Sequence, residues 1–188
     1  MWGSKMLRCV LAVLLLGLSG TASAEFFIGA DATSLKSYID WSAPSIDQNF
    51  KLTPARLRLG YQGEFFGLEI HGYSNVDDTS TDNGFTDKLE IDTSYGIYLR
   101  MQEKWVYALL GATWFDTYYT DVNLGITDRD VIAMPTFALG FDIPLGKNLA
   151  VNVDYTYADG NANYSQITGF GSPTLRIQGP GLGVTMKF

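Results

Sequence analysis

Apolar and polar residues alternate along most of the chain after residue 24. A period of two places successive side chains on opposite faces of a β-strand. The pattern recurs in segments of about ten residues, the length that membrane-spanning strands need. We therefore predict eight strands, at 25–33, 52–61, 65–74, 88–101, 105–115, 132–144, 149–158 and 176–188.

The segment 88–101 shows the pattern most clearly. Every second residue from Leu89 to Met101 is apolar or Thr93, and the residues between them include Glu90, Asp92 and Arg100. We expect the Leu89 face to contact lipid and the Glu90 face to point into the interior of a sheet closed on itself.

The connections between the predicted strands alternate strictly in length. Short connections lie at 62–64, 102–104 and 145–148, and long polar ones at 34–51, 75–87, 116–131 and 159–175. Tight turns at one end and long loops at the other are typical of an up-and-down barrel in an outer membrane. The sequence thus predicts an all-β fold, an eight-stranded antiparallel up-and-down transmembrane β-barrel.

Aromatic residues gather near the ends of these segments, as expected of girdles at the two membrane interfaces. Core aromatics of a soluble sandwich are the alternative. The candidate girdle residues are Tyr61, Phe65, Phe66, Trp105, Trp114, Tyr155, Tyr157 and Phe188.

Residues 1–24 have the features of a cleaved secretory signal peptide. Lys5 and Arg8 precede an apolar run at 10–18, and Ala22-Ser23-Ala24 forms a small-residue cleavage site. The domain left after cleavage, 25–188, contains no cysteine, so disulfide and thiol chemistry are excluded there. Without Lys5 and Arg8, 11 Lys and Arg stand against 20 Asp and Glu, and the net charge falls from −7 to −9. Nucleic acid is therefore not an expected partner.

The last predicted strand is similar to the closing strand of outer-membrane β-barrel proteins, which the barrel-assembly machinery recognises. Its expected assembly signal consists of Leu182, Val184, Met186 and Phe188. Leu175 and Ile177 are apolar at odd positions instead, which predicts a β-bulge at Gly179-Pro180-Gly181. The alternative is that Leu175 and Ile177 stand above the membrane.

Several segments resemble strands of the OmpA transmembrane domain. They are 26–30, which resembles its first strand, 106–111, which resembles its fifth, and 135–142 with 149–157, which resemble its sixth and seventh. Two departures from that family are expected: no peptidoglycan-binding domain after Phe188, and Asn152 at an interior position where that family can carry a basic residue. The size is closer to OmpX-like single-barrel proteins. The resemblance implies an integral protein of a Gram-negative outer membrane.

Eight strands enclose an interior that side chains can fill, so we predict a polar network rather than an open pore. A two-residue turn at Gly63-Glu64 would set Arg58 opposite Glu69, as an interior salt bridge, and Arg56 opposite His71. Buried charges need such partners. The predicted interior network is Asp31, Arg56, Arg58, Glu69, His71, Glu90, Asp92, Arg100, Asp142 and Asp154.

Glu69, His71 and Ser94 also supply the residue types of an acid–His–Ser catalytic group. A loop centred near residue 81 would bring Glu69 near Ser94 and His71 near Asp92. His71 is the single histidine, however, and an interior site would be cut off from acyl chains. We therefore expect no enzyme activity and no catalytic residues, with an outer-membrane lipid hydrolase that uses His71 as a minor alternative.

A small porin-like channel is the main alternative function. Six glycines fall on the predicted interior face, and they either leave room for water or relieve crowding beside tyrosines such as Tyr73, Tyr98 and Tyr107. These glycines are Gly29, Gly67, Gly96, Gly111, Gly140 and Gly183.

The long loops are rich in aspartate. Asp77, Asp78 and Asp82 could coordinate a hard cation, although a solvated acidic loop is the simpler interpretation. We predict no cofactor and no metal. The acidic loops disfavour direct binding of lipopolysaccharide phosphates unless divalent cations bridge, while Trp41, Tyr118, Tyr119 and Phe170 are candidate contacts for a partner surface.

The expected function is structural or surface-interactive, in adhesion or envelope integrity, for a monomeric barrel. Its expected partners are outer-membrane lipids and lipopolysaccharide, and the barrel-assembly machinery and periplasmic chaperones during biogenesis. A secreted lipocalin-like ligand binder is the alternative outside membranes, and it would need the apolar faces inside.

Overall fold

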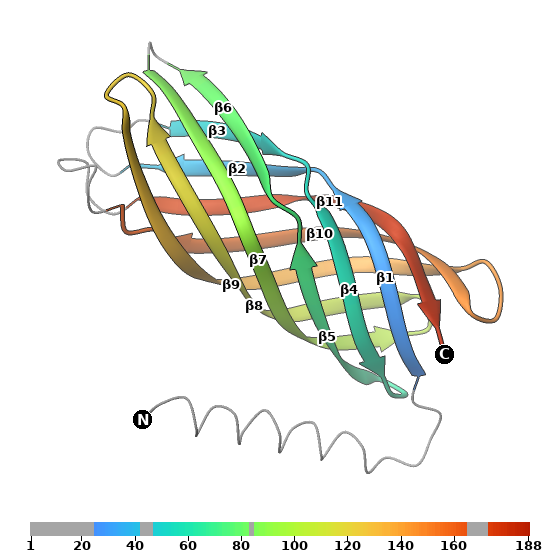
Figure 1. The fold of residues 1–188 in the computed structure, drawn as a ribbon. Helices are drawn as coiled ribbons and strands as arrows, with labels where there is room; N and C mark the ends of the chain where they lie inside the picture. Colours follow the sequence, from blue (N-terminus) through green and yellow to red (C-terminus); the bar gives the residue numbers. More distant parts are fainter. Residues whose placement is uncertain (1–24, 42–46, 83–84, 165–172) are drawn as a thin grey trace, which may run out of the picture.

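The computed structural model describes residues 25–41, 47–82, 85–164 and 173–188. These residues form one antiparallel sheet of eleven strand segments that closes on itself (Figure 1). The predicted signal peptide, the contact candidate Phe170 and the side chain of Asp82 lie outside what is described. Within the described ranges, no helix is long and apolar enough to cross a membrane.

Six of the segments are halves of interrupted strands. The pairs are β1 (Glu25–Thr33) with β2 (Leu35–Asp40), β3 (Asp47–Leu52) with β4 (Ala55–Gln62), and β5 (Phe66–Tyr73) with β6 (Val76–Asp82). The other five strands are unbroken: β7 (Phe85–Glu103), β8 (Val106–Asp121), β9 (Ile126–Pro144), β10 (Leu149–Asn161) and β11 (Thr174–Lys187).

Taken this way, the described chain builds eight long strands in up-and-down order. The barrel closes where β1 pairs with β4 on one side and with β11 on the other. The predicted fold class, an eight-stranded antiparallel barrel, is confirmed. We call the end with the β4–β5, β7–β8 and β9–β10 connections the turn end, and the opposite end the loop end.

The loops predicted from the sequence are too long. β7 and β9 have 19 residues each, and the strands continue far into the segments predicted as loops. At about 3.4 Å per residue such a strand is about 65 Å long. A membrane strand needs only about 9–11 residues, so roughly half of the barrel extends beyond what a bilayer would cover.

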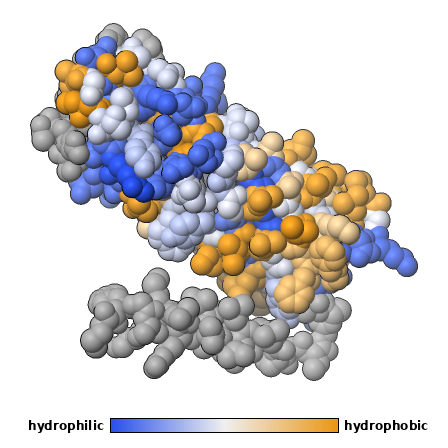
Figure 2. Space-filling model, in the orientation of Figure 1, coloured by the Kyte–Doolittle hydropathy of each residue, from blue (hydrophilic) through white to orange (hydrophobic). Residues whose placement is uncertain are grey.

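The outer surface changes character halfway along the barrel (Figure 2). In the turn-end half, the outward side chains form an exposed apolar band that includes Leu57 and Leu182, at 63% and 61% exposure. In the loop-end half, most outward positions hold polar and charged residues such as Lys36, Asp77 and Arg129, with Val131 as an exception. The apolar faces of the turn-end half point away from the interior, which excludes a lipocalin-like arrangement there.

Aromatic residues lie at both borders of the apolar band. Near the turn end, Tyr61 packs edge-on against Phe26, with ring centroids 5.3 Å apart, and Trp105 lies near Phe141. At the other border Tyr95 stacks on Trp114, the last apolar outward residue of β8 before Asp116. These pairs occupy the positions expected of two aromatic girdles.

The interior of the loop-end half is apolar, which sequence analysis did not anticipate. Its core, the apolar interior cluster, draws residues from both halves of the chain. The cluster consists of Leu35, Ile39, Trp41, Phe50, Leu52, Leu89, Ile91, Phe115, Tyr119, Ile132, Met134, Ala158, Ala162, Tyr164, Leu175 and Ile177.

Two predictions about strand register are wrong, one in β11 and one in β7, and both concern residues of this cluster. The β10–β11 ladder runs without interruption from Leu149↔Met186 to Asn161↔Thr174, so there is no bulge at Gly179-Pro180-Gly181. Leu175 and Ile177 point inward and Leu182 outward on one regular strand. What changes along β11 is the polarity of the interior, not the register.

The irregularity lies instead in β7, where the β7–β8 register shifts between Ile91 and Ser94. This shift turns Leu89 and Ile91 inward, into the apolar interior cluster, although both were predicted to face lipid. Tyr95, Ile97 and Leu99 beyond it face outward as predicted.

Candidate functional site

A buried network of charged side chains fills the interior of the turn-end half. At its centre is Glu69 of β5, which is fully buried. Glu69 Oε1 accepts a hydrogen bond from Arg58 Nε and pairs with His71 Nε2 at 2.8 Å. Glu69 Oε2 accepts a hydrogen bond from Arg100 Nη1 at 2.7 Å. One carboxylate therefore joins side chains from β4, β5 and β7.

A second group joins the first through Asp31 of β1. Arg56 Nε donates to Asp31 Oδ1 at 2.8 Å, and Arg56 Nη2 donates to Asp154 Oδ2 at 2.5 Å. Arg58 Nη1 lies 3.8 Å from Asp31 Oδ2, which connects the two groups. All of these side chains are at most 1% exposed.

Arg100 extends the network towards the turn end. Its Nη2 donates to Asp142 Oδ2 at 2.7 Å, and its guanidinium lies 3.9 Å from the ring centroid of Tyr107 and 5.2 Å from that of Phe27. Tyr107 in turn donates to Asp154 Oδ2 at 2.9 Å. Ion pairs, hydrogen bonds and cation–π contacts thus compensate the buried charges together.

The structure brings together eight of the ten residues predicted for this site: Asp31, Arg56, Arg58, Glu69, His71, Arg100, Asp142 and Asp154. We call these eight residues the polar interior network. Glu90 and Asp92 do not belong to it. Because the register of β7 shifts beside them, both point outward, and Glu90 pairs with Lys88 on the outer surface.

The predicted opposition of strands is also wrong, by two residues. Arg58 lies opposite His71, and Arg56 lies opposite Tyr73. Arg58 and Glu69 nevertheless form the ion pair expected of them, since a shift of two residues keeps each side chain on the same face. Likewise His71 lies opposite Gly96 and Glu69 opposite Tyr98, not Asp92 and Ser94.

The contacts of His71 do not fit an acid–His–Ser arrangement. Its Nε2 pairs with Glu69 and its Nδ1 lies 3.4 Å from Tyr73 Oη, so both ring nitrogens have partners. The Oγ of Ser94 is buried and has no hydrogen-bond partner among the described residues. A serine nucleophile needs a histidine nitrogen to take its proton, and here neither ring nitrogen is directed to Ser94.

The glycines of the predicted interior face allow close approach of larger groups. A Cβ atom on Gly96 would lie 2.4 Å from Tyr98 Oη, and one on Gly140 would lie 2.6 Å from the Tyr107 ring. At Gly183 it would lie 2.1 Å from Asp31 Cβ. These positions are occupied by neighbouring side chains, as the crowding interpretation expects.

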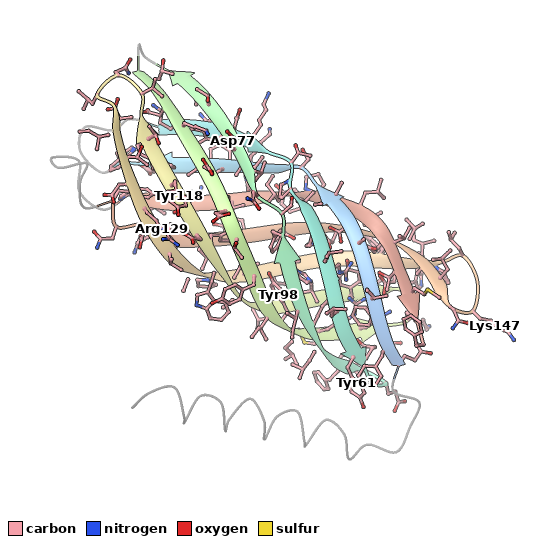
Figure 3. The ribbon with its side chains drawn as sticks, viewed as in Figure 1. Tyr61, Asp77, Tyr98, Tyr118, Arg129 and Lys147 are labelled. Carbon is pink, nitrogen blue, oxygen red and sulfur yellow. The ribbon has the colours of Figure 1, made fainter. Side chains whose placement is uncertain are left out.

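The outer surface of the loop-end half carries ion pairs between neighbouring strands. Lys88 Nζ lies 2.7 Å from Asp77 Oδ2, and hydrogen bonds with Asp77 and Glu90 raise the pKa of Lys88. Arg129 donates to both oxygens of Asp116, at 2.8 and 2.5 Å, which lowers the pKa of that carboxyl. Tyr118, a predicted contact residue, lies under the Arg129 guanidinium at 5.2 Å (Figure 3).

The structure also shows where the other predicted contact residues lie and which partners the acidic residues have. Trp41 and Tyr119 are buried in the apolar interior cluster, so they are not outward contact residues. Asp77 pairs with Lys88, and Asp78 Oδ2 accepts the backbone N–H of Lys51 at 2.6 Å. Among the described residues, no three His, Cys, Asp or Glu side chains are placed to hold one metal ion.

Sequence reasoning missed the residues that build the apolar interior cluster. The signal was present, because Leu35, Ser37 and Ile39 are alternate residues that share one face of a strand, as are Leu175 and Ile177. These residues lay in, or at the edge of, segments interpreted as loops. Periodicity alone does not reveal which face is buried.

Comparisons with known proteins bear on the fold. No family model matches the sequence, and no curated protein matches it either. Among solved structures, Neisserial surface protein A is 17% identical, with a TM-score of 0.57, over 89% of this chain and 100% of that one. Ail, the attachment invasion locus protein of Yersinia pestis, was solved with the heparin analogue sucrose octasulfate. It is 14% identical, with a TM-score of 0.52, over the same shares of both chains. This chain therefore has the fold of these small β-barrels.

Proposed function

We propose that the chain is an integral protein of a Gram-negative outer membrane whose role is to present a surface for interaction. The observation that carries this proposal is the division of the barrel into two halves. The turn-end half exposes an apolar band and buries charge, the inverse of a soluble protein. Surrounding this band with lipid removes its apolar surface from water.

The orientation follows from the two ends of the barrel. Outer-membrane barrels keep short turns in the periplasm and their longer extramembrane segments outside, and here the chain beyond the apolar band, strand extensions included, is long only at the loop end. The turn end would then be periplasmic, and the loop-end half would project from the cell. The apolar interior cluster stabilises the projecting half in the way that an apolar core stabilises a soluble β-barrel. The outer surface of this half therefore keeps a defined shape.

The polar interior network and the glycine contacts support a barrel that does not conduct. Gly96 and Gly140, which would line a channel, face the side chains of Tyr98 and Tyr107. The apolar interior cluster would form a second barrier on the extracellular side. Planar-bilayer recordings test this: stable conductance steps would favour the porin-like alternative, and silence the proposal.

The partner is expected to differ from the sulfated ligand bound by Ail. The outer surface here presents Asp77, Asp116 and Asp159, each already paired with one of the few basic residues. A polyanion would meet repulsion, so basic or divalent-cation-bridged partners are favoured. Sucrose octasulfate should not bind the purified barrel at physiological ionic strength.

Lipids and lipopolysaccharide contact the apolar band in this proposal. The assembly residues Leu182, Val184, Met186 and Phe188 all face outward, where assembly factors would meet them. Fractionation tests the localisation directly. Recovery in the outer membrane, with migration on gels that changes on heating, is expected, and recovery as a soluble periplasmic protein would refute it.

No enzyme activity is proposed, since His71 is engaged by Glu69 and Tyr73. Assays of phospholipid and lipid A hydrolysis with wild type and His71→Gln test this. An activity that wild type has and the variant lacks would restore the hydrolase alternative.

A further inference from the structure

Two aspartates face each other inside the loop-end half. Asp87 of β7 and Asp121 of β8 are direct cross-strand partners, and they are only 4% and 9% exposed. Directly opposite residues have Cβ atoms about 4.5–5.5 Å apart, and like charges in this relation destabilise a sheet. The fold thus holds two carboxyl groups close together in the interior of the loop-end half.

No basic side chain of the described residues pairs with these two aspartates. The segments outside the described ranges after residue 24 are 42–46, 83–84 and 165–172, and they contain no lysine, arginine or histidine. His71, the single histidine, belongs to the polar interior network. The basic residues of the loop-end half all point outward, and they are Lys36, Lys51, Lys88, Arg129 and Arg176.

The two aspartates accept hydrogen bonds from neutral donors only. Asp87 Oδ2 accepts one from Gln48 Nε2, and Asp121 Oδ1 accepts the backbone N–H of Leu124 at 2.9 Å. Burial and the charge of Asp121 raise the pKa of Asp87, while a hydrogen bond with Tyr119 opposes this shift. Neutral donors do not balance charge, so the pair lacks a counter-ion within the described chain.

Gln48 of β3 supplies a further oxygen beside the pair. Its side chain is 1% exposed, and its Oε1 is buried without a hydrogen-bond partner among the described residues. A buried acceptor without a donor is costly. The nitrogen of the same amide contacts Asp87, so a turn of the amide about its last bond would direct Oε1 to a ligand held by both aspartates.

We propose that Asp87, Asp121 and Gln48 bind a divalent metal cation, which we assign as calcium. Buried carboxylates are stable when they are paired or coordinate a metal, and two of them balance two positive charges. Calcium accepts irregular sets of about six to eight oxygen ligands, whereas magnesium needs a nearly ideal octahedron. Water would complete the set, because the site offers two carboxylates and one amide oxygen. The inference goes beyond the proposed surface role.

The ion would join strands that the sheet leaves separate. β3, which carries Gln48, pairs only with β2, whereas Asp87 and Asp121 belong to the β7–β8 ladder. Calcium held by all three side chains would connect these two parts of the wall beside Tyr119 of the apolar interior cluster. Calcium should therefore raise the urea concentration at which the loop-end half unfolds.

The test uses the intact, chelator-treated barrel in phosphatidylcholine nanodiscs, whose lipid carries no net charge. Terbium takes the place of calcium at oxygen sites and emits when a nearby aromatic side chain transfers energy to it. Trp41 lies 5.7 Å from Tyr119 between ring centroids. Excitation through tryptophan should therefore give saturable terbium emission, which calcium displaces and potassium does not. Trp41→Phe keeps all three ligands and should lose most of this emission.

Calorimetric titration with calcium compares ligand variants with matched controls. A dissociation constant of about 10⁻⁴–10⁻³ M is expected for wild type, as in extracellular calcium modules. Asp87→Asn, Asp121→Asn and Gln48→Met should each weaken binding by about tenfold or more. Asp40→Asn removes the same charge from an exposed position of the loop-end half, and it should bind within about twofold of wild type.

A second control addresses the outward acidic residues of β6. Asp77→Asn should also bind like wild type, because Asp77 lies on the outer surface and pairs with Lys88. Heat-modifiable migration shows which variants fold. Any one ligand variant that folds decides the comparison, and the terbium and calcium titrations of wild type do not depend on a variant.

Three results would overturn the inference. They are terbium emission that does not saturate or is not displaced by calcium, equal calcium binding by wild type and a folded ligand variant, and a loss of binding in Asp77→Asn alone. The first would mean that protons and not a metal neutralise the pair. None of these results bears on the proposed outer-membrane role, which fractionation tests separately.

Discussion

Arg58 and Glu69 form a fully buried ion pair although they are not opposite each other in the sheet. Arg58 lies opposite His71 and reaches diagonally to Glu69, whose own cross-strand neighbour is Gly60. This diagonal leaves Glu69 Oε2 free to accept Arg100 from the next strand. One carboxylate thereby balances two guanidinium groups.

Replacing Glu69 by glutamine should be strongly destabilising. The neutral amide would remove the charge that Arg58 and Arg100 share and leave Arg58 with only the more distant Asp31, at 3.8 Å, and Arg100 with Asp142. Removing one partner of a buried ion pair costs about 3–5 kcal/mol. Urea unfolding of the barrel in micelles, followed by tryptophan fluorescence, measures the change. The control is Glu103→Gln at an exposed position, for which a change within about 0.5 kcal/mol is expected. Equal losses for the two variants would contradict the central role of Glu69.

Much of this network was predictable, because the face of the sheet on which a side chain lies can be read from the sequence even where the pairing of residues across strands cannot. The alternation of Arg56 and Arg58 with apolar residues shows which face is polar, and charges in a closed barrel find partners there. The pairing was two residues off, since the two-residue turn lies at Glu64-Phe65, with Gly63 N–H donating to Phe66 O, and not at Gly63-Glu64 as predicted. A period of two cannot detect a shift of two, so the prediction of the network survived that error.

Replacing Leu175 by alanine should destabilise the loop-end half. Leu175 is fully buried in the apolar interior cluster, and truncating such a side chain costs about 2–5 kcal/mol, depending on the cavity left. The control is Gln178→Ala, half-buried on the same strand, with an expected change within about 0.5 kcal/mol. Unfolding in urea and protease cleavage of the loop-end half measure both variants. A neutral Leu175→Ala would mean that this cluster does not hold the projecting half together.

The apolar interior cluster could not be assigned from sequence alone, for a physical reason. Leu175 and Leu182 are the same residue type in opposite surroundings. Leu175 points into the interior of the loop-end half, and Leu182 points outward in the apolar band. A regular strand carries both, and only the change in environment along its length distinguishes them. Residues 91–94 contain no glycine or proline that would have indicated the register shift between Ile91 and Ser94.

Asp87 and Asp116 should give opposite dependences of stability on pH. Burial raises the pKa of Asp87, with Asp121 adding to the shift. Its contribution to folding is therefore present at low pH and lost as pH rises through the raised pKa. The hydrogen bonds from Arg129 lower the pKa of Asp116, so its contribution is present at neutral pH and lost as pH falls.

Urea unfolding of Asp87→Asn and Asp116→Asn across pH 3 to 8 measures these slopes. Relative to wild type, Asp87→Asn should gain stability as pH rises, and Asp116→Asn should lose it. The two variants serve as controls for each other because both remove one negative charge from the loop-end half. Slopes of the same sign would show that net charge, and not the local contacts, sets the dependence.

The position of the membrane boundary on β11 gives the sharpest test of the division of the barrel. Val184 and Gln178 both point outward on one uninterrupted strand, but Val184 lies in the apolar band and Gln178 above it. An arginine facing lipid near the bilayer midplane costs about 2–4 kcal/mol, and the cost falls towards zero at the interface. Val184→Arg should therefore lose stability by about that amount in phospholipid vesicles, and Gln178→Arg by less than about 1 kcal/mol. Because the new side chain is identical, the difference between the two losses reports the surroundings of each position. Equal losses at 178 and 184 would place both residues in one environment, and the proposed projection of the loop-end half beyond the bilayer would be wrong.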